Sequence, residues 1–340
     1  MSKHLIAGAA GVALAAALAL PAAAQTTTLR YNNWIPATHF IIADGFVKYF
    51  DDIAKATEGR VKVELTAQSL GAPPRQMQLA VDGIADIAWG VHSYTPGTYP
   101  LAEMVELPFI GHGADKDSVA YWRVYKAMFE KTGMHPAGVH TLGVHVHPPG
   151  NVYNSKQPIK SVDDFKGLKL RTANASTTIA FQKFGAVPIT MPVTQLRDSL
   201  SKGVVDGTMF TSEGFINFRI ADLIKHGTLI EGGLYSQSFF LVINKKKWDA
   251  LPEKDRAAID KLSGEALARR IGKRWQDEEN AGHDKLMKAG VQLVKADAAM
   301  MAKMKDALAH IEKAWIEKAK AKGVDGAAAI RMLKEEAGKM

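Results

Sequence analysis

The sequence predicts an α/β fold, and three observations support that class. Segments of alternating apolar residues at Leu29–Trp34 and Val61–Leu65 flank an amphipathic helical pattern over residues 38–57. The same order of strand, helix and strand recurs over residues 161–213. The chain has 340 residues, which is enough for two domains, and its 47% hydrophobic and 23% charged residues are ordinary for a globular protein.

Residues 1–24 have the pattern of a secretory signal. A basic start precedes an apolar run, Leu5–Leu20, and an alanine-rich end. We therefore expect cleavage near Ala24 and Gln25 and a periplasmic, soluble mature protein. The alternative is an uncleaved membrane anchor, for which the apolar run is short. The sequence has no cysteine, which excludes disulfides and thiol chemistry.

The segment over residues 70–99 is expected to supply one wall of a cleft. A helix is predicted over Arg75–Val81 and a short strand from Ala85 to Trp89. Trp89, His92 and Tyr94 lie at or just beyond the carboxyl end of that strand, where ligands bind in open α/β sheets. Packing in the core is the alternative for Trp89.

Two extended segments are expected to connect two lobes. They are residues 139–153 and Ser238–Asn244, which is apolar enough to be fully buried. If both connect the lobes, each lobe is discontinuous in sequence, and the predicted divisions are residues 25–148 plus 237–276 for lobe I and 149–236 plus 277–340 for lobe II.

Further helices are predicted along the chain, and one is far longer than a typical globular helix. That helix runs from Pro252 to about Lys288, with Gly264 and Gly272 as possible bending points. The others are expected at residues 115–132, 297–321 and 325–337.

His145 and His147 face the same side of a strand, which is a spacing that metal ligands use. No Cys, Asp or Glu lies close by in the sequence to complete a site. The sequence therefore predicts no metal and no cofactor.

Residues 161–213 form the segment with the clearest chemical signal. Leu168, Leu170 and Thr172 alternate with Lys169 and Arg171, which predicts a short strand with Arg171 at its end. The elements expected after it are a helix over Ser176–Phe184, a strand over Val187–Met191, a short helix capped by Thr194 and ending near Gly203, and a buried strand over Val204–Gly207 with an Asp-Gly turn.

Arg171 is the candidate ligand-binding residue. A guanidinium is planar and permanently charged, and its parallel N–H donors match the two oxygens of a carboxylate. At the carboxyl end of a strand it is placed to bind a small anion. The alternative is a surface arginine in an ion pair with Asp163 or Asp164.

Three motifs in this part of the chain carry a resemblance to a known family. They are F-K-G-L-K-L-R-T at residues 165–172, F-G-A-V-P-I-T-M-P at 184–192 and G-V-V-D-G at 203–207. The chain resembles the DctP-like solute-binding proteins of tripartite ATP-independent periplasmic (TRAP) transporters over about residues 28–290. The resemblance implies a two-lobed fold with a hinge, a ligand cleft, a long helix spanning both lobes, and integral membrane subunits as partners driven by a sodium gradient. It also implies that Arg171 clamps the ligand carboxylate.

Two departures from the family pattern narrow the range of ligands that we expect. Many members have an asparagine that contacts ligand where this chain has Phe210, so a polar group is replaced by an apolar wall. Members that bind sialic acid have a second arginine about twenty residues before the first. That neighbourhood here has no arginine, although Asn151 and Asn154 offer hydrogen bonds, so sialic acid is disfavoured.

The remaining candidates suggest a monocarboxylate with an aromatic or apolar body. Met209 and Phe215 would extend the apolar lining, although core packing is the alternative for each. Glu213 and Gln237 would bind hydroxyl groups, and His92 would add a hydrogen bond whose strength depends on pH.

The favoured function is therefore a periplasmic binding protein for a small carboxylate rather than an enzyme. No G-x-S-x-G, H-E-x-x-H or phosphate-loop motif is present. The net charge of +8 comes mainly from mixed helical faces, without the aromatic platforms of a nucleic-acid module. The alternatives are a binding subunit of another transporter or a chemoreceptor system and an exported hydrolase or isomerase, which would need a perturbed carboxylate or histidine beside Arg171.

Overall fold

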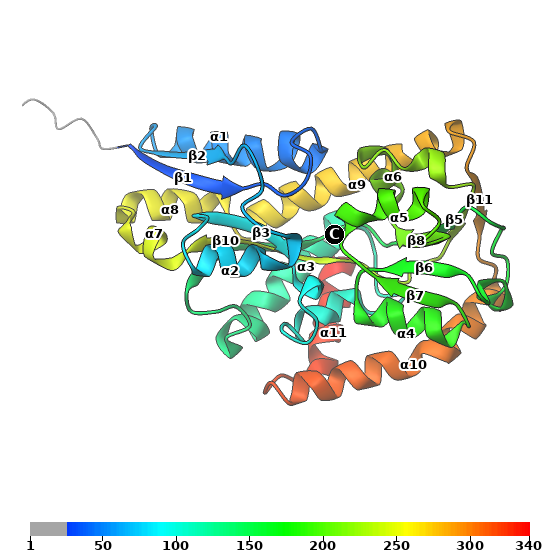
Figure 1. Ribbon diagram of the computed structural model, residues 1–340. Coiled ribbons are helices and arrows are strands. Elements are labelled where there is room, and N and C mark those ends of the chain that lie inside the picture. Colours follow the sequence, from blue (N-terminus) through cyan, green and yellow to red (C-terminus); the bar gives the residue numbers. More distant parts are fainter. Residues whose placement is uncertain (1–25) are drawn as a thin grey trace, which may run out of the picture.

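The structure, a computed structural model, describes residues 26–340, so the expected signal segment lies outside the described residues. Its elements form two β-sheets with helices packed around them, and the two sheets lie in separate halves of the molecule (Figure 1). None of the described helices is both long enough and apolar enough to cross a membrane. The expected α/β class with two lobes is confirmed.

The first sheet has five strands in the order β2-β1-β3-β10-β4. The first three of these strands are parallel, because helices connect them, and β10 runs antiparallel to both of its neighbours. Every residue of β10 is buried, as its unbroken apolar sequence predicts. The bounds are β1 (Thr27–Asn32), β2 (Val61–Leu65), β3 (Ile87–Val91), β4 (Val139–Val146) and β10 (Ser238–Asn244).

The second sheet has six strands in the order β11-β9-β5-β8-β6-β7. The chain enters it directly after β4 and returns to the first sheet at β10, so two extended connections join the sheets. The exact lobe boundaries stay a prediction. The bounds are β5 (Asn151–Asn154), β6 (Lys169–Thr172), β7 (Val187–Thr190), β8 (Gly207–Phe210), β9 (His226–Leu229) and β11 (Gln292–Lys295).

The helices cover the faces of both sheets. A π-helical turn at Ile41–Phe46 precedes the first of them. Their bounds are α1 (Val47–Ala56), α2 (Gln76–Val81), α3 (Ala114–Val124), α4 (Ala175–Lys183), α5 (Leu196–Ser201), α6 (Ser212–Asn217), α7 (Lys245–Ala250), α8 (Glu253–Leu262), α9 (Glu265–Lys288), α10 (Ala298–Lys320) and α11 (Gly326–Gly338).

The long helix α9 connects the two halves of the molecule. It packs against α3 in the first half and α6 in the second, and Figure 1 shows it running past both sheets. The predicted bend at Gly264 is a complete break between α8 and α9, with φ of 61° at that glycine. Gly272 lies inside the continuous helix, where a Cβ atom would approach the carbonyl oxygen of Ala114 to 2.4 Å. The glycine therefore permits close packing of α9 on α3.

One predicted strand is wrong. The segment Val204–Gly207 was expected to be a buried strand with an Asp-Gly turn, but Val204 is 46% exposed and β8 only begins at Gly207. A Cβ atom at Gly207 would lie 2.1 Å from the carbonyl oxygen of Tyr153 on β5. The glycine thus serves the close approach of two strands, and no tight turn is formed. Likewise Thr194 caps no helix, because it lies within a 3₁₀ turn whose N-cap is Pro192.

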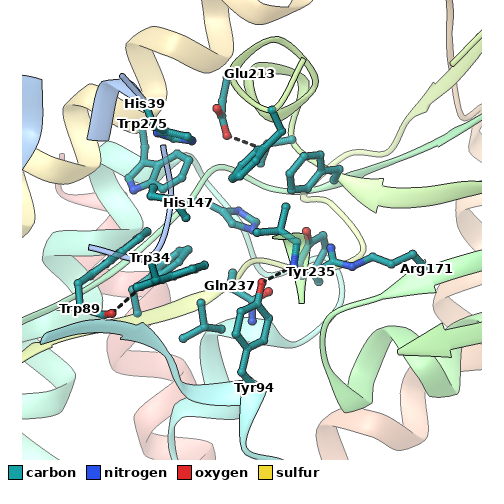
Figure 2. Close-up of a pocket in the computed structure, with 17 residues that line it drawn as sticks. Trp34, His39, Trp89, Tyr94, His147, Arg171, Glu213, Tyr235, Gln237 and Trp275 are labelled. Atoms are coloured by element: carbon teal, nitrogen blue, oxygen red, sulfur yellow. Dashed lines mark hydrogen bonds between the residues drawn. The ribbon is translucent and has the colours of Figure 1, made fainter. Parts of the chain in front are cut away.

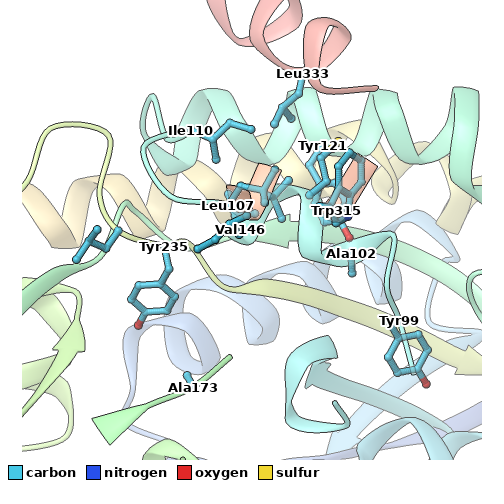
Figure 3. Packing of buried hydrophobic residues seen from close by; sticks show 14 of the residues in the cluster. Tyr99, Ala102, Leu107, Ile110, Tyr121, Val146, Ala173, Tyr235, Trp315 and Leu333 are labelled. Atoms are coloured by element: carbon cyan, nitrogen blue, oxygen red, sulfur yellow. The ribbon is translucent and has the colours of Figure 1, made fainter. Parts of the chain in front are cut away.

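A continuous apolar core reaches from the outer helices to the region between the sheets. Tyr121 of α3, Trp315 of α10 and Leu333 of α11 pack on one side of the first sheet (Figure 3). The same cluster continues through Val146 to Tyr235 beside the second sheet. The core therefore fixes the position of the segment that forms the back of the site described next.

Candidate ligand-binding site

A pocket lies between residues of the two sheets (Figure 2). Small-molecule sites are mostly apolar with a few polar groups, and the lining of this pocket has that composition. Its walls come from the ends of β3 and β8, from the segment before α1, from the connections around β10, and from α9. The lining residues are Trp34, Ile35, His39, Trp89, Val91, Tyr94, His147, Arg171, Val193, Phe210, Thr211, Glu213, Phe218, Tyr235, Gln237, Phe239 and Trp275.

Arg171 is the permanent cation of the pocket and is only 1% exposed. It lies in β6 between β7 and β8, and its Nε donates to the carbonyl oxygen of Met191 at 2.9 Å. Its Nη2 is buried without a hydrogen-bond partner. Within residues 26–340 no carboxylate lies within ion-pair distance of Arg171, and Asp164 instead accepts from the backbone of Lys160 and Ser161. The alternative of a structural ion pair is therefore wrong.

Aromatic rings form most of the remaining wall. Trp34 and Trp89 stack at 5.1 Å, and Phe239 stacks on both Trp89 and Trp275 at 5.1 and 5.7 Å. On the second sheet the Phe210 ring lies 6.0 Å from the Arg171 guanidinium carbon, a cation–π distance. A planar apolar group next to Arg171 would thus contact aromatic faces.

His39 and Trp275 each have an N–H group without a partner. The Nδ1 atom of His39 accepts from the backbone N–H of Ile41 at 3.3 Å, and burial lowers the pKa of His39 to about 3. The neutral ring must therefore have its proton on Nε2, which is buried and unpaired. The Nε1 atom of Trp275 is also buried and unpaired, and the two ring centroids are 6.0 Å apart.

His147 offers an acceptor to the pocket. Its Nδ1 donates to the carbonyl oxygen of Pro148 at 2.6 Å, which leaves Nε2 unprotonated in the neutral ring. Burial is the main cause that lowers the pKa of His147 to about 4, and the charge of Arg171 adds to it.

Glu213 is a carboxyl group that is mostly neutral at pH 7. Burial, with the nearby Glu279 carboxylate, raises the pKa of Glu213 to about 8. Its oxygens accept hydrogen bonds from Thr211 Oγ1 at 2.7 Å and Asn217 Nδ2 at 3.0 Å. Arg171 is consequently the dominant charge in the pocket.

Tyr94 and Gln237 form hydrogen bonds between segments of the pocket wall. The hydroxyl of Tyr94, which follows β3, accepts from the backbone N–H of Val193, which follows β7, at 3.1 Å. Gln237 donates to Ser93 and, at 3.1 Å, to the buried carboxyl of Glu106. The first bond joins the two halves between residues that both line the pocket, and with Arg171 buried between them this is a closed arrangement of the lobes.

Six of the ten sequence-predicted site residues line this pocket. They are Arg171, Phe210, Trp89, Tyr94, Glu213 and Gln237.

Two aromatic or sulfur-containing candidates do not line it. Met209 precedes Phe210 on β8, and because successive side chains of a strand face opposite sides, Met209 packs into the core behind the sheet. Phe215 is fully buried against Tyr153 at 4.6 Å and Phe210 at 5.4 Å, behind the pocket wall.

Two polar candidates, His92 and Asn151, also lie outside the lining of this pocket. His92 is buried beside β10, with Nδ1 bonded to Ser238 Oγ and Nε2 to His135, and it borders a separate small cavity. Asn151 uses its side-chain oxygen to accept from the backbone N–H of Ile230 at 2.8 Å, which holds a loop of the second half.

The pocket also contains residues that sequence reasoning missed. His147 and Phe239 lie on or beside the two predicted connecting strands, and their alternate positions on those strands were an available signal. Trp34 ends the predicted strand Leu29–Trp34, so the rule that selected Trp89 applied to it as well. Among the other missed residues, four come from long-range packing and had no local signal: His39, Phe218, Tyr235 and Trp275.

Two α/β lobes that enclose a small-molecule pocket define a bilobal binding protein. Residues 34–318 match the family described as bacterial extracellular solute-binding protein, family 7, and the chain belongs to this family. The expected relation to TRAP solute-binding proteins is thereby confirmed. The family consists of receptors for small solutes that work with membrane subunits, rather than enzymes.

Individual relatives extend over nearly the whole chain. A Comamonas testosteroni protein named outer membrane transporter protein TsaT is 31% identical over 330 residues, which is 96% of each chain. A TRAP periplasmic solute-binding protein of Bordetella bronchiseptica with bound (R)- and (S)-mandelate is 33% identical with a TM-score of 0.89, over 92% of this chain and 99% of that one. A marine metagenome TRAP protein specific for aromatic acids, in complex with 3-hydroxybenzoate, is 30% identical with a TM-score of 0.86, over 93% and 99%.

Proposed function

We propose that this protein captures an aromatic monocarboxylate in the periplasm, after cleavage of its signal segment, and presents it to the membrane subunits of a TRAP transporter. The observation that carries the proposal is the buried guanidinium of Arg171, whose Nη2 has no partner and which faces a cavity walled by aromatic rings. A carboxylate would form the charge-assisted bonds that Arg171 lacks. The stacked tryptophans and phenylalanines would enclose an apolar ring.

The charge of the pocket favours a monoanion over a dianion. Among the residues that line it, only Arg171 is permanently cationic. His39 and His147 are neutral at pH 7, because burial of each imidazole lowers its pKa. A second ligand carboxylate would be buried without a counter-charge, which is costly. Dicarboxylates should therefore bind weakly. Uronates have one carboxylate and are disfavoured for a different reason, because their hydroxyl groups would be buried against aromatic rings.

Two solved relatives are consistent with this proposal. The Bordetella bronchiseptica protein holds mandelate, and the marine metagenome protein holds 3-hydroxybenzoate. Both ligands have one carboxylate on an aromatic body, which is the shape that the pocket supports here.

The test is a thermal-shift panel on refolded, ligand-free mature protein. The acids should include benzoate, mandelate, phenylacetate, a 2-oxo acid, succinate and glucuronate. A ligand at 100 times its Kd stabilises the folded state by about 2.7 kcal/mol, which is readily seen as a rise in Tm. A rise with aromatic monocarboxylates alone is expected. A rise with succinate alone would refute the monocarboxylate assignment, and a rise with glucuronate alone would refute the aromatic one.

A second measurement separates binding from catalysis. His147 and Glu213 have displaced pKa values and line the same pocket as Arg171, which is the arrangement that an enzyme would need. Ligand recovered from the complex after long incubation should be chemically unchanged by mass spectrometry. Conversion of the acid would show that the protein is an enzyme.

A further inference from the structure

At the end of the pocket away from Arg171, two buried N–H groups have no hydrogen-bond acceptor. His39 Nε2 and Trp275 Nε1 both carry a hydrogen, both are buried, and neither has a partner among residues 26–340. Their rings are adjacent, and both line the pocket, as Figure 2 shows. Buried N–H groups in native proteins are nearly always paired, so two neighbouring exceptions in one cavity point to a ligand atom.

This pair lies at a distance from Arg171 along the pocket wall. His39 packs on Phe218 with centroids 5.2 Å apart, Phe218 on Phe210 at 6.0 Å, and Phe210 lies 6.0 Å from the Arg171 guanidinium carbon. Two aromatic rings thus separate the two donors from the cation. A ligand that meets both ends has its carboxylate at one end and an acceptor at the other.

We propose that His39 and Trp275 form a subsite for a neutral oxygen on the ligand ring, so that the preferred ligands are aromatic monocarboxylates that carry a ring hydroxyl group. This inference rests on the proposed function and adds the substituent that the site selects. Each N–H donates one hydrogen bond to the ring oxygen, which has two lone pairs.

The surroundings favour a hydroxyl over a second carboxylate. The subsite has two neutral donors and no cation, so a carboxylate there would be buried without a counter-charge. Glu213 lines the same pocket, and its backbone N–H donates to Glu279, which is one helical turn from Trp275 on α9. Its carboxyl group is the available acceptor for the proton of a ring hydroxyl.

The experiment compares paired acids by calorimetry on the full mature protein. The pairs are benzoate with 3-hydroxybenzoate, benzoate with 4-hydroxybenzoate, and phenylacetate with 3-hydroxyphenylacetate. The measured quantity is the ratio of the two Kd values in each pair. In the wild type at least one hydroxylated acid should bind about tenfold more tightly than its parent, as two neutral hydrogen bonds to buried donors imply.

Two variants remove one donor each. Trp275→Phe removes the N–H and keeps an aromatic ring, and His39→Asn removes the distal donor while its side-chain oxygen can still accept from Ile41. Each should lower the hydroxyl preference, which is the ratio of the two Kd values within a pair, by about three- to tenfold, because a change in wall packing acts on both members of a pair alike. His39→Gln, whose amide nitrogen can reach the Nε2 position, should retain the preference.

Trp34→Phe is the matched control, because Trp34 Nε1 already donates to the carbonyl oxygen of Trp89 at 2.8 Å. It should change the affinity for both members of a pair alike. The subsite is refuted if every pair binds equally in the wild type, or if the preference survives in Trp275→Phe and, where that variant folds, in His39→Asn. Failure of every acid in the panel to bind, substituted and unsubstituted alike, would refute the proposed function itself, so the two failures are distinguishable.

Discussion

Replacement of Arg171 by methionine is the sharpest perturbation of the proposed clamp. Methionine keeps much of the side-chain length and removes the charge, at a site that is 1% exposed and has no acidic partner within the described residues. Breaking a buried charge pair by removing one member costs about 3 to 5 kcal/mol. Because about 1.4 kcal/mol is one decade in Kd, we expect affinity for an aromatic monocarboxylate to fall by roughly two to four decades.

The same substitution should not destabilise the ligand-free protein much. Only one hydrogen bond is lost, from Nε to Met191, while an unpaired buried cation is removed. The ligand-free Tm should therefore remain close to that of the wild type, whereas the rise in Tm with ligand should disappear. Arg171→Lys should also bind weakly, because an ammonium group lacks the bidentate geometry.

Calorimetry and thermal melting together measure both effects. The matched control is Arg197→Met on the same half of the molecule, where the arginine is half-exposed and pairs with the exposed Asp222 at 3.2 Å. Such surface pairs contribute little, so Arg197→Met should bind normally. A Kd for Arg171→Met within threefold of the wild type would remove Arg171 from the site and refute the reasoning.

Four further outcomes follow from the contacts described above. Tyr94→Phe removes the hydrogen bond between the two halves and should raise Kd by about two- to tenfold, mainly through faster dissociation in stopped-flow measurements. Gly272→Ala should lower Tm through a clash that costs about 1 to 3 kcal/mol, whereas Gly338→Ala in the open last helix should not, and equal melting of the two would contradict the packing argument. Affinity for a carboxylate should fall as pH rises through about 8, where Glu213 ionises beside the ligand, and Glu213→Gln should abolish that fall. Burial lowers the pKa of His135 to about 3, so on acidification the unfolded chain takes up a proton at this residue before the folded protein does. The contribution of His135 to the free energy of unfolding is complete above about pH 6.5 and should decline as pH falls toward 3. Replacement by glutamine should reduce the pH slope of the free energy of unfolding by up to about 1.4 kcal/mol per pH unit in acid unfolding curves.

Local sequence patterns predicted the parts of the fold that local patterns control. The alternation around Arg171 gave its strand, and the unbroken apolar run at Ser238–Asn244 gave a fully buried one. The segment at Val204–Gly207 misled because its glycine reflects contact with a distant strand rather than a turn. A short apolar run does not reveal which distant backbone approaches it.

The site residues divide in the same way, into those that local sequence predicts and those that depend on distant contacts. Arg171 and Phe210 follow from motif position, and Trp89 and Tyr94 follow from their place after a strand. Trp275 lies in the middle of a long helix, where a buried aromatic residue is ordinarily a packing residue. Only the three-dimensional structure shows that its N–H has no partner and that its ring borders a cavity.

The unpaired donors also indicate how ligand and closure are coupled. In the closed arrangement, Arg171 Nη2, His39 Nε2 and Trp275 Nε1 are all buried and have no acceptor among residues 26–340. An unmet buried hydrogen bond costs about 1 to 3 kcal/mol, and a charged group costs more. Opening the lobes would let water satisfy all three, so the empty protein should favour the open state. A ligand that supplies acceptors for these groups binds the closed state selectively, and a difference of about 5.5 kcal/mol is sufficient to reverse a 99-to-1 preference. The polar groups that select the ligand are therefore the same groups that make closure depend on it.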